Sequence, residues 1–287
     1  MTPDQYCQEK AVQSGSSFYY SFLFLPAAQR RAITALYALC RELDDTVDGI
    51  SEPDVARIKL AWWRSELDKL FAGHPEHPVT KALQPHLAPF DMTPARLMAI
   101  VDGMEMDLNQ NRYLDYPALR RYCWHVAGVV GELSAGIFGY QDPSTLQFAA
   151  KLGEAFQLTN ILRDVGDDAR HGRIYLPIDA LQAHQVKAND ILNRQYSKDF
   201  QSLMQTQFEL AQRTYREALA LLPDQDRRAQ RPGLMMAAIY YNLLLELRAS
   251  DFQVLHQRIS LTPLRKLWLA WKAYVSQGRS TLKLIGR

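Results

Sequence analysis

The sequence has few of the residues that would indicate a disulfide-stapled or zinc-bound framework, a nucleic-acid partner or a membrane span. Three cysteines occur in 287 residues, without a CxxC spacing, which argues against a disulfide framework or a zinc site. The net charge is +2, and no dense block of Lys or Arg precedes the C-terminal region, so nucleic-acid binding has no support. The longest strongly apolar stretch, residues 18–28, is interrupted by Ser21 and Pro26. It falls short of the roughly 18–20 apolar residues that span a bilayer.

Several motifs that carry chemistry are also missing. The sequence contains no HExxH, no Walker A loop, no GxGxxG and no GxSxG, so the metalloprotease, P-loop, dinucleotide-fold and hydrolase patterns are absent. The first residues show no basic segment followed by an apolar core, the pattern of a secretory signal. Together with the unpaired cysteines, this predicts a cytoplasmic protein with reduced thiols.

The composition predicts a helical protein. Hydrophobic residues make up 47% of the chain, enough for a sizeable core, and helix formers dominate over alternating β-branched runs. No linker or composition shift divides the chain. We therefore expect one all-α domain over residues 1–287, with helices packed around a central space. The predicted helices cover residues 4–13, 27–49, 52–72, 78–87, 93–110, 115–138, 143–165, 178–183, 188–193, 197–221, 231–249 and 261–276.

Two aspartate clusters are the most informative feature. Asp44 and Asp48 are four residues apart in one predicted helix, and Asp164 and Asp168 repeat the spacing in another. This spacing places both carboxylates on one helix face, where like charges repel each other. Mg²⁺ would turn that repulsion into a binding site, because it prefers hard oxygen ligands and is commonly shared with substrate phosphates. A solvated acidic face is the alternative, but the apolar residues that precede each pair disfavour it.

Polar and basic residues extend both clusters. Gln157 and Asn160 continue the face of Asp164 toward the N-terminus of its helix, so a polar stripe runs along a helix that is otherwise apolar. Buried polar groups need partners, and a metal with its ligand would supply them. Arg41 and Arg163 adjoin the clusters; each is either an ordinary ion-pair partner or a bidentate ligand for diphosphate oxygens. Arg258 is a weaker candidate for the same role.

Small and aromatic residues suggest an apolar ligand. Ala127, Gly128, Gly131, Ser134 and Ala135 share one helical face, which indicates either close helix packing or room for a long ligand. Aromatic side chains could line a hydrocarbon pocket and stabilise a carbocation through the ring quadrupole, although each is individually more typical of core packing. These aromatic candidates are Phe18, Phe22, Tyr37, Tyr122, Tyr175 and Tyr240 or Tyr241.

The C-terminal stretch 264–275 is amphipathic and basic. Its apolar positions fall on one helical stripe, and Arg and Lys residues lie between them. Packing against the body of the protein is the simpler interpretation. Peripheral contact with the anionic inner face of the cytoplasmic membrane is the alternative.

These motifs resemble those of the squalene/phytoene synthase family of head-to-head prenyl transferases. The resemblance runs from residue 16 to residue 258 and is most specific in YALCRELDDTVD (37–48), YCWHVAGVVG (122–131) and QLTNILRDVGDD (157–168). Within the family, FYYSFLFLP (18–26) and GRIYLP (172–177) are most similar to the bacterial hopanoid-pathway branch, presqualene diphosphate synthase.

The resemblance implies an isoprenoid-synthase-type bundle around a central hydrophobic cavity that takes two farnesyl diphosphate molecules. It implies Mg²⁺, or Mn²⁺ as a substitute, held by Asp44, Asp48, Asn160, Asp164 and Asp168. These aspartates and Tyr37 would form the catalytic set, and NADPH is not expected for condensation to presqualene diphosphate. The expected substrate-binding residues are Ser17, Phe18, Phe22, Arg41, Tyr122, Val126, Val130, Gln157, Asn160, Arg163, Tyr240, Tyr241 and Arg258.

Several alternatives stay open at this point. A complete squalene synthase would add an NADPH-dependent reduction, and a phytoene or dehydrosqualene synthase would make another product. A catalytically silent helical assembly factor is disfavoured by the intact aspartates, and a head-to-tail prenyl synthase by the context of the first cluster. Downstream enzymes of lipid synthesis are conceivable partners.

Overall fold

The computed structural model describes residues 1–13, 22, 25–48 and 52–286, except for the side chain of Asp48. In these ranges all regular elements are helices, and the single pairing of β type is an isolated bridge between Arg112 and Ile174. The fold is therefore all-α, as predicted. The main helices are α1 (Pro3–Gln13), α3 (Ala27–Asp48), α4 (Pro53–Phe71), α5 (Pro78–Leu83), α6 (Pro94–Asn109), α7 (Tyr116–Cys123), α8 (Val129–Phe138), α9 (Ser144–Arg170), α10 (Ile178–Ala183), α11 (Ala188–Leu192), α12 (Lys198–Ala220), α13 (Arg231–Ala249), α14 (Pro263–Val275) and α15 (Arg279–Ile285).

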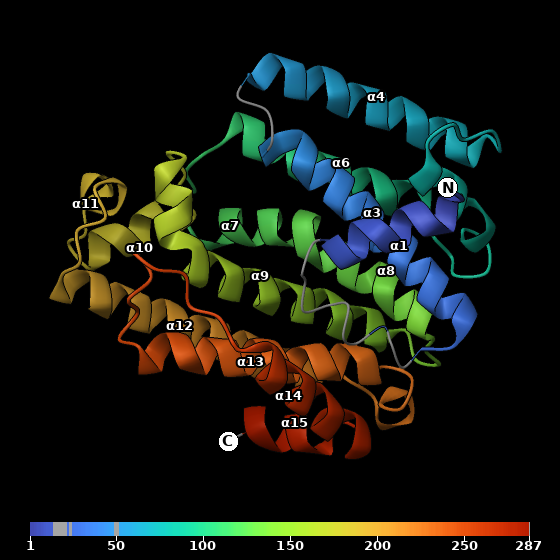
Figure 1. Cartoon of the computed structure of the whole chain (residues 1–287). Helices are drawn as coiled ribbons and strands as arrows, with labels where there is room; N and C mark the ends of the chain where they lie inside the picture. Colours follow the sequence, from blue (N-terminus) through green and yellow to red (C-terminus); the bar gives the residue numbers. More distant parts are fainter. Residues whose placement is uncertain (14–21, 23–24, 49–51, 287) are drawn as a thin grey trace.

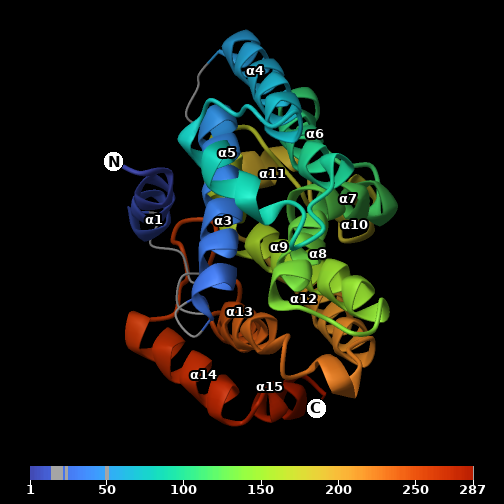
Figure 2. The ribbon, with the colours of Figure 1, turned by 90° about the vertical axis from the view of Figure 1, so that its right-hand side faces the viewer.

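The helices lie in successive layers. In Figure 1, α4 forms the top, α3 and α6 lie below it, α7, α8 and α9 cross the middle, and α12 and α13 follow. The last helices, α14 and α15, form the bottom of the molecule, and Figure 2 shows the same order from the side. The two helices that carry the aspartate clusters, α3 and α9, thus belong to different layers.

Local sequence signals set where many of these helices begin. Proline is the first helical residue of α4, α5, α6 and α14. An N–H at this position has no hydrogen-bond acceptor within the helix, so proline loses nothing by lacking one. Side chains also accept hydrogen bonds from the free backbone N–H groups of the first turn. The caps are Thr93 on α6, Asp115 on α7, Ser197 on α12 and Thr262 on α14.

Three features differ from the predicted helices. The predicted helix 115–138 contains a π-helical turn at Trp124–Gly128 between α7 and α8. The predicted helix 143–165 continues to Arg170, so the whole second aspartate cluster is helical. Residues 279–285 form α15, which the sequence analysis missed. Its N-cap, Gly278, has a φ of +78°, a left-handed conformation that glycine adopts without strain.

Glycine allows α8 and α9 to approach closely. A Cβ atom on Gly131 would lie 2.3 Å from the carbonyl oxygen of Ala149, and one on Gly153 would lie 2.4 Å from that of Ala127. The small-residue face therefore serves helix packing. Ala127, Gly131, Ser134 and Ala135 also line a cavity, so the two interpretations of this face are compatible.

Two hydrophobic cores flank that cavity. One is built mainly from α3, α4, α6 and α8, with Leu36, Leu39 and Leu67 completely buried. The other is built mainly from α9, α12 and α13, with Phe208 and Tyr215 completely buried. Their packing fixes α3 and α9 as rigid walls of the space between them.

None of the helices in the described ranges is long and apolar enough to cross a membrane. The longest of them, α9, carries the charged second cluster along its C-terminal half.

Gly131→Ala is expected to lower the free energy of unfolding by about 1–3 kcal/mol, because the new methyl group would collide with a backbone carbonyl of α9. Gly233→Ala is the matched control: its Cβ would meet no atom closer than 3.8 Å, and alanine favours the helix by up to about 1 kcal/mol. Urea unfolding followed by circular dichroism measures both. A Gly131→Ala protein as stable as the parent would contradict this account of the α8–α9 contact.

Candidate active site

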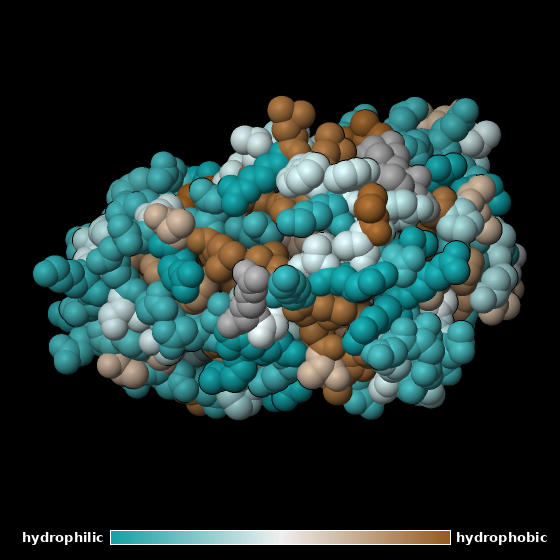
Figure 3. All heavy atoms as spheres, turned by 90° about the horizontal axis from the view of Figure 1, so that it is seen from below, coloured by the Kyte–Doolittle hydropathy of each residue, from teal (hydrophilic) through white to brown (hydrophobic). Residues whose placement is uncertain are grey.

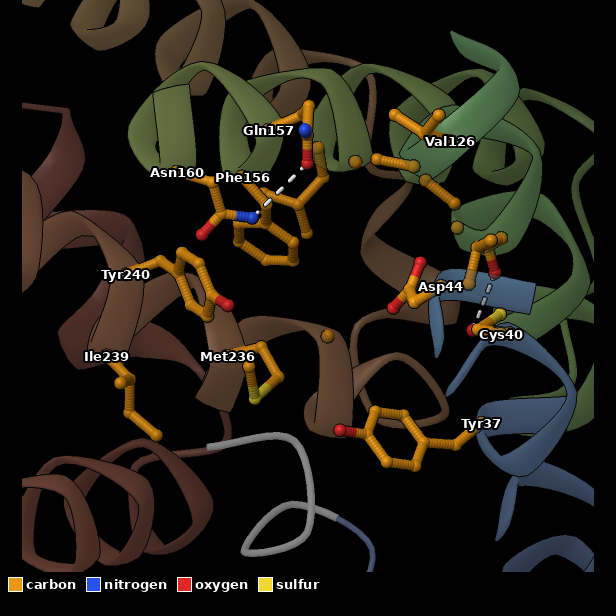
Figure 4. A pocket seen from close by; sticks show the side chains of 18 of the residues that line it. Tyr37, Cys40, Asp44, Val126, Phe156, Gln157, Asn160, Met236, Ile239 and Tyr240 are labelled. Atoms are coloured by element: carbon orange, nitrogen blue, oxygen red, sulfur yellow. Dashed lines mark hydrogen bonds between the residues drawn. The ribbon is translucent and has the colours of Figure 1, made fainter. Parts of the chain in front are cut away.

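One large cavity, of about 800 Å³, opens between the two cores. Its walls come from α3, α6, α8, α9 and α13, together with residues 258–266 before and within α14. Figure 4 shows Asp44 pointing into this cavity from α3, and Gln157 and Asn160 pointing into it from α9. The cavity therefore brings together the two helices that the sequence analysis singled out.

The α3 wall presents Tyr37, Arg41 and Asp44 to the cavity. These residues are four and three apart, so helical periodicity places them on one face. Arg41 donates from Nη1 to Asp44 Oδ2 over 3.1 Å and from Nη2 to Asp45 Oδ1 over 2.9 Å. One guanidinium thus offsets part of the negative charge of two carboxylates.

Three of the predicted site residues cannot be placed on this wall. Asp48 is the last residue of α3, but its side chain lies outside the described part of the structure. Ser17 and Phe18 also lie outside it. Phe22 is described; it is buried and lines the cavity, with its ring edge-to-face against Tyr37 at a centroid distance of 6.2 Å.

The α9 wall presents the predicted polar stripe. Gln157, Asn160, Asp164 and Asp168 all line the cavity. Asn160 Nδ2 donates to Gln157 Oε1 over 3.2 Å, as drawn in Figure 4. The extension of α9 to Arg170 keeps all four side chains on one continuous helix, which fixes their spacing.

Basic side chains surround Asp164. Arg163 Nε and Arg258 Nε both donate to Asp164 Oδ1, over 2.8 and 3.1 Å. Lys266 of α14 lines the cavity nearby, and burial together with the positive charges of Arg163 and Arg258 lowers the pKa of Lys266. Two guanidinium groups from separate parts of the chain thus contact one carboxylate, and Lys266 lies close enough to both to be affected by their charge. A diphosphate bound here would meet a locally positive environment.

The oxygen atoms of this wall fit a hard divalent cation. Asn160 Oδ1 is buried and accepts no hydrogen bond from any described residue, which is unusual for a buried acceptor. The carboxylates of Asp164 and Asp168 line the same cavity. Among the residues that the structure describes, no three His, Cys, Asp or Glu side chains form a metal-ligand group. Carboxylate and amide oxygens of this kind are ligands that suit Mg²⁺, which is commonly shared between protein and substrate phosphates.

A tyrosine–aspartate cluster lines another part of the cavity. The Tyr122 hydroxyl donates to Asp107 Oδ2 over 3.0 Å, and the Tyr175 hydroxyl donates to Asp107 Oδ1 over 2.7 Å. The two rings stack at a centroid distance of 5.2 Å. Burial, and then the charge of Asp107, raise the pKa of both phenols, so both remain protonated at neutral pH.

The sequence analysis missed Asp107 and Lys266 as site residues, and Arg173, which also lines the cavity. Asp107 lies three residues after Met104 on α6, and both line the cavity. The sequence signal for Asp107 is therefore a charged residue on an otherwise apolar helix face. That signal is weak, because a single aspartate near a helix C-terminus is usually solvated. Its tyrosine partners lie 15 and 68 residues away, and only the fold brings them together.

Most of the remaining lining is apolar. Val126, Val130 and Tyr240 line the cavity as expected, together with Phe156 and Met236. An elongated hydrocarbon would find continuous apolar contact there.

Tyr241 is placed elsewhere, so a substrate-binding role for it is not retained. Its hydroxyl accepts a hydrogen bond from Gln212 Nε2 over 2.8 Å, and its ring packs edge-to-face on Tyr215. Adjacent residues on a helix point about 100° apart, and α13 is rotated so that Ile239 and Tyr240 line the cavity while Tyr241 packs on Tyr215.

Comparison with known proteins agrees with this arrangement. The family model for squalene/phytoene synthase matches residues 11–265. Phytoene synthase of Arthrospira platensis is 36% identical over 279 residues, covering 91% of this chain and 89% of the relative. The 15-cis-phytoene synthase of Synechococcus elongatus is 35% identical over 275 residues, covering 91% and 89%.

Solved structures show the same fold. A dehydrosqualene synthase in complex with a ligand superposes with a TM-score of 0.84 at 28% identity, covering 96% of both chains. The squalene synthase HpnC from Alicyclobacillus acidocaldarius superposes with a TM-score of 0.74 at 24% identity, covering 87% of this chain and 94% of the other. With its aspartate-bearing helices on one apolar cavity and its family match over nearly the whole length, the chain belongs to the squalene/phytoene synthase family of prenyl transferases.

Proposed function

We propose that this protein joins two farnesyl diphosphate molecules head to head to give presqualene diphosphate. The observation that carries the proposal is that two helices, α3 and α9, direct carboxylates into one cavity whose remaining walls are largely apolar. Two diphosphate groups and two hydrocarbon chains require this division between charged and apolar surface. The farnesyl chain length rests on the resemblance of the sequence to the hopanoid-pathway branch.

In the proposed reaction, the C1–O bond of one farnesyl diphosphate breaks, and diphosphate leaves with the bonding electron pair. The allylic cation is attacked by the double bond of the second molecule, and loss of a proton closes a cyclopropane ring. Mg²⁺ bound by Asp44, Asp48, Asn160, Asp164 and Asp168 would neutralise the leaving diphosphate, with Mn²⁺ as a substitute. NADPH has no part in this reaction.

The protein side chains have three roles in this scheme. Arg163 and Arg258, already oriented by Asp164, would bind diphosphate oxygens, and Arg41 would do so on α3. The rings of Tyr37 and Phe22 would face the developing cation. Asp107 would act as a positioning residue, because it fixes the hydroxyl groups of Tyr122 and Tyr175 at the cavity wall.

Synthesis of phytoene from two geranylgeranyl diphosphates is the second candidate. It is favoured by relatives at 35–36% identity that are phytoene synthases. The same residues would serve either chain length, because the charged groups contact the diphosphates and the apolar wall contacts the chains. The two candidates therefore differ in substrate length and in product.

The first test is turnover with labelled prenyl diphosphates. Purified protein with Mg²⁺ and farnesyl diphosphate is expected to accumulate presqualene diphosphate, and added NADPH is expected to leave that product unchanged. Thin-layer chromatography of the products before and after phosphatase treatment measures this. Squalene formed on addition of NADPH would identify a complete squalene synthase. Turnover of geranylgeranyl diphosphate alone would move the assignment to phytoene synthesis.

The second test removes one carboxylate from each wall. Asp44→Asn and Asp164→Asn are each expected to reduce turnover by at least roughly 100-fold, because each weakens the charge stabilisation of the leaving group. Chelation with EDTA is expected to abolish turnover, and Mg²⁺ or Mn²⁺ to restore it.

Asp167→Asn is the matched control on α9. Asp167 is half-exposed, pairs with Arg170 and is not part of the cavity wall, so its replacement is expected to leave turnover unchanged. Thermal unfolding checks that all three variants are folded. A fully active Asp44→Asn or Asp164→Asn protein would rule out the proposed metal ligands.

The third test concerns the tyrosine–aspartate cluster. Asp107→Asn keeps the size of the side chain but replaces one acceptor oxygen by an amide, so one tyrosine hydroxyl loses its partner. We expect kcat to fall by roughly 10- to 100-fold, with little change in KM, because misplacement of groups in the cavity affects the transition state more than binding. Tyr175→Phe is expected to have a smaller effect in the same direction. Unchanged kcat in both would limit the cluster to a structural role.

A further inference from the structure

The C-terminal helix α14 exposes a row of large apolar side chains. Within it, Trp268 and Trp271 stack on each other at a centroid distance of 5.1 Å, yet 56% and 49% of their surfaces are exposed. The stripe is continuous along the helix, because its members fall at positions i, i+3, i+4, i+7 and i+11, which share one helical face. The residues of this α14 stripe are Leu264, Leu267, Trp268, Trp271 and Val275, with exposed fractions of 80%, 43%, 56%, 49% and 59%.

The core of the protein uses the opposite face of α14. Ala270 and Ala273 are 1% exposed and belong to the second hydrophobic core. Lys266 lies between them and the start of the helix and lines the cavity. The simpler interpretation of the sequence, in which the apolar stripe packs on the body of the protein, is therefore wrong: small alanines make that contact, and the tryptophans face outward.

The charge around the stripe has one sign. Residues 252–287 contain seven Lys and Arg and no Asp or Glu. The whole chain has a net charge of only +2, so the remainder of the chain is net negative. Lys272, Arg279 and Lys283 are exposed on α14 and α15, whereas Arg265 pairs with Glu246 over 2.6 Å. Figure 3 shows this side of the molecule from below, with hydrophobic side chains gathered among hydrophilic ones.

We propose that α14 and α15 form a docking surface for an anionic lipid bilayer. The α14 stripe enters the interface between headgroups and acyl chains, where tryptophan is favoured, and the basic side chains contact the headgroups. Lys and Arg side chains near an anionic membrane are attracted to its surface charge. The apolar stripe thus matches the acyl-chain boundary of an anionic bilayer, and the basic side chains match its headgroups.

A second copy of this chain is the competing occupant, and the charge argues against it. A symmetric dimer places the same surface of each copy against the other. Two faces without acidic groups between residues 252 and 287 would then repel each other. An anionic bilayer neutralises the same charges and also covers the tryptophans.

The docking surface adjoins the substrate cavity. Lys266 lines the cavity from the inner face of α14, one residue before Leu267 of the stripe. Binding to a bilayer would therefore hold one wall of the cavity at the lipid surface. This consequence holds for either chain length considered above.

The test is co-sedimentation of the full chain with two kinds of vesicle. One is made of phosphatidylcholine alone, and the other also contains roughly 30% of the anionic lipid phosphatidylglycerol. The parent protein is expected to bind the anionic vesicles at low salt and to dissociate at high salt. The double variant Trp268→Ser/Trp271→Ser is expected to bind at least about tenfold more weakly. The charge-reversal variant Lys272→Glu/Arg279→Glu is expected to lose its preference for anionic vesicles.

Trp62→Ser is the matched control. Trp62 lies on α4, at the opposite end of the molecule from α14 (Figure 1), and is 44% exposed, so its replacement is expected to leave vesicle binding unchanged. Thermal unfolding and turnover in detergent establish that each variant is folded.

Three results would overturn the proposal. They are absence of vesicle binding by the parent protein, binding that the α14 variants leave unchanged, and loss of binding in Trp62→Ser. A dimer in sedimentation velocity that Trp268→Ser/Trp271→Ser disrupts, without vesicle binding, would instead assign the surface to a second copy.

Discussion

Carboxylates that border an apolar cavity are the constraint on which the rest of this structure depends. Asp44 on α3 and Asp164 and Asp168 on α9 line this cavity and are partly withdrawn from solvent, and charge in such a position is costly unless it is paired. Arg41 offsets part of this charge on α3, and Arg163 and Arg258 offset it on α9. The pairing differs between the walls: two guanidinium groups share one carboxylate on α9, whereas on α3 Arg41 bridges Asp44 and Asp45, and Lys10 also pairs with Asp45 over 2.9 Å. Two identical substrates that must act as donor and acceptor would meet different electrostatic environments.

The helix packing makes this arrangement rigid. The α8–α9 contact is close enough that a single methyl group on Gly131 would meet a backbone carbonyl, and such contacts leave little freedom for α9 to move. The polar stripe of α9 is therefore held at a fixed position relative to the apolar wall. Asp107 has a similar effect at another wall, because it holds two tyrosine hydroxyls that come from α7 and from the segment after α9. Preorganised polar groups of this kind are the usual source of transition-state stabilisation.

Helix α14 connects the cavity with the outer surface. Helix α14 has small residues toward the core, Lys266 toward the cavity and tryptophans toward the outside. A helix that contributes to the cavity wall on one side and presents an apolar stripe on the other would link a lipid-like substrate to the surface from which it is supplied. The proposed membrane surface and the proposed chemistry rest on different observations, and both are consistent with a lipid-like substrate.

The sequence by itself determined the all-α class, most helix positions and the two aspartate clusters, because helical periodicity and capping are local properties of the chain. It also indicated Arg41, Gln157 and Asn160, since each lies at helical spacing from an aspartate of its own helix. Only the tertiary structure decided which residues meet. Asp107 with its tyrosines, and Lys266 with Arg163, join residues that are distant in sequence, and no periodicity connects them. The choice of Tyr240 over Tyr241 depended on the rotation of α13 about its axis, and the outward face of α14 depended on alanine making the core contact. These outcomes are set by packing between helices, which the local pattern does not encode.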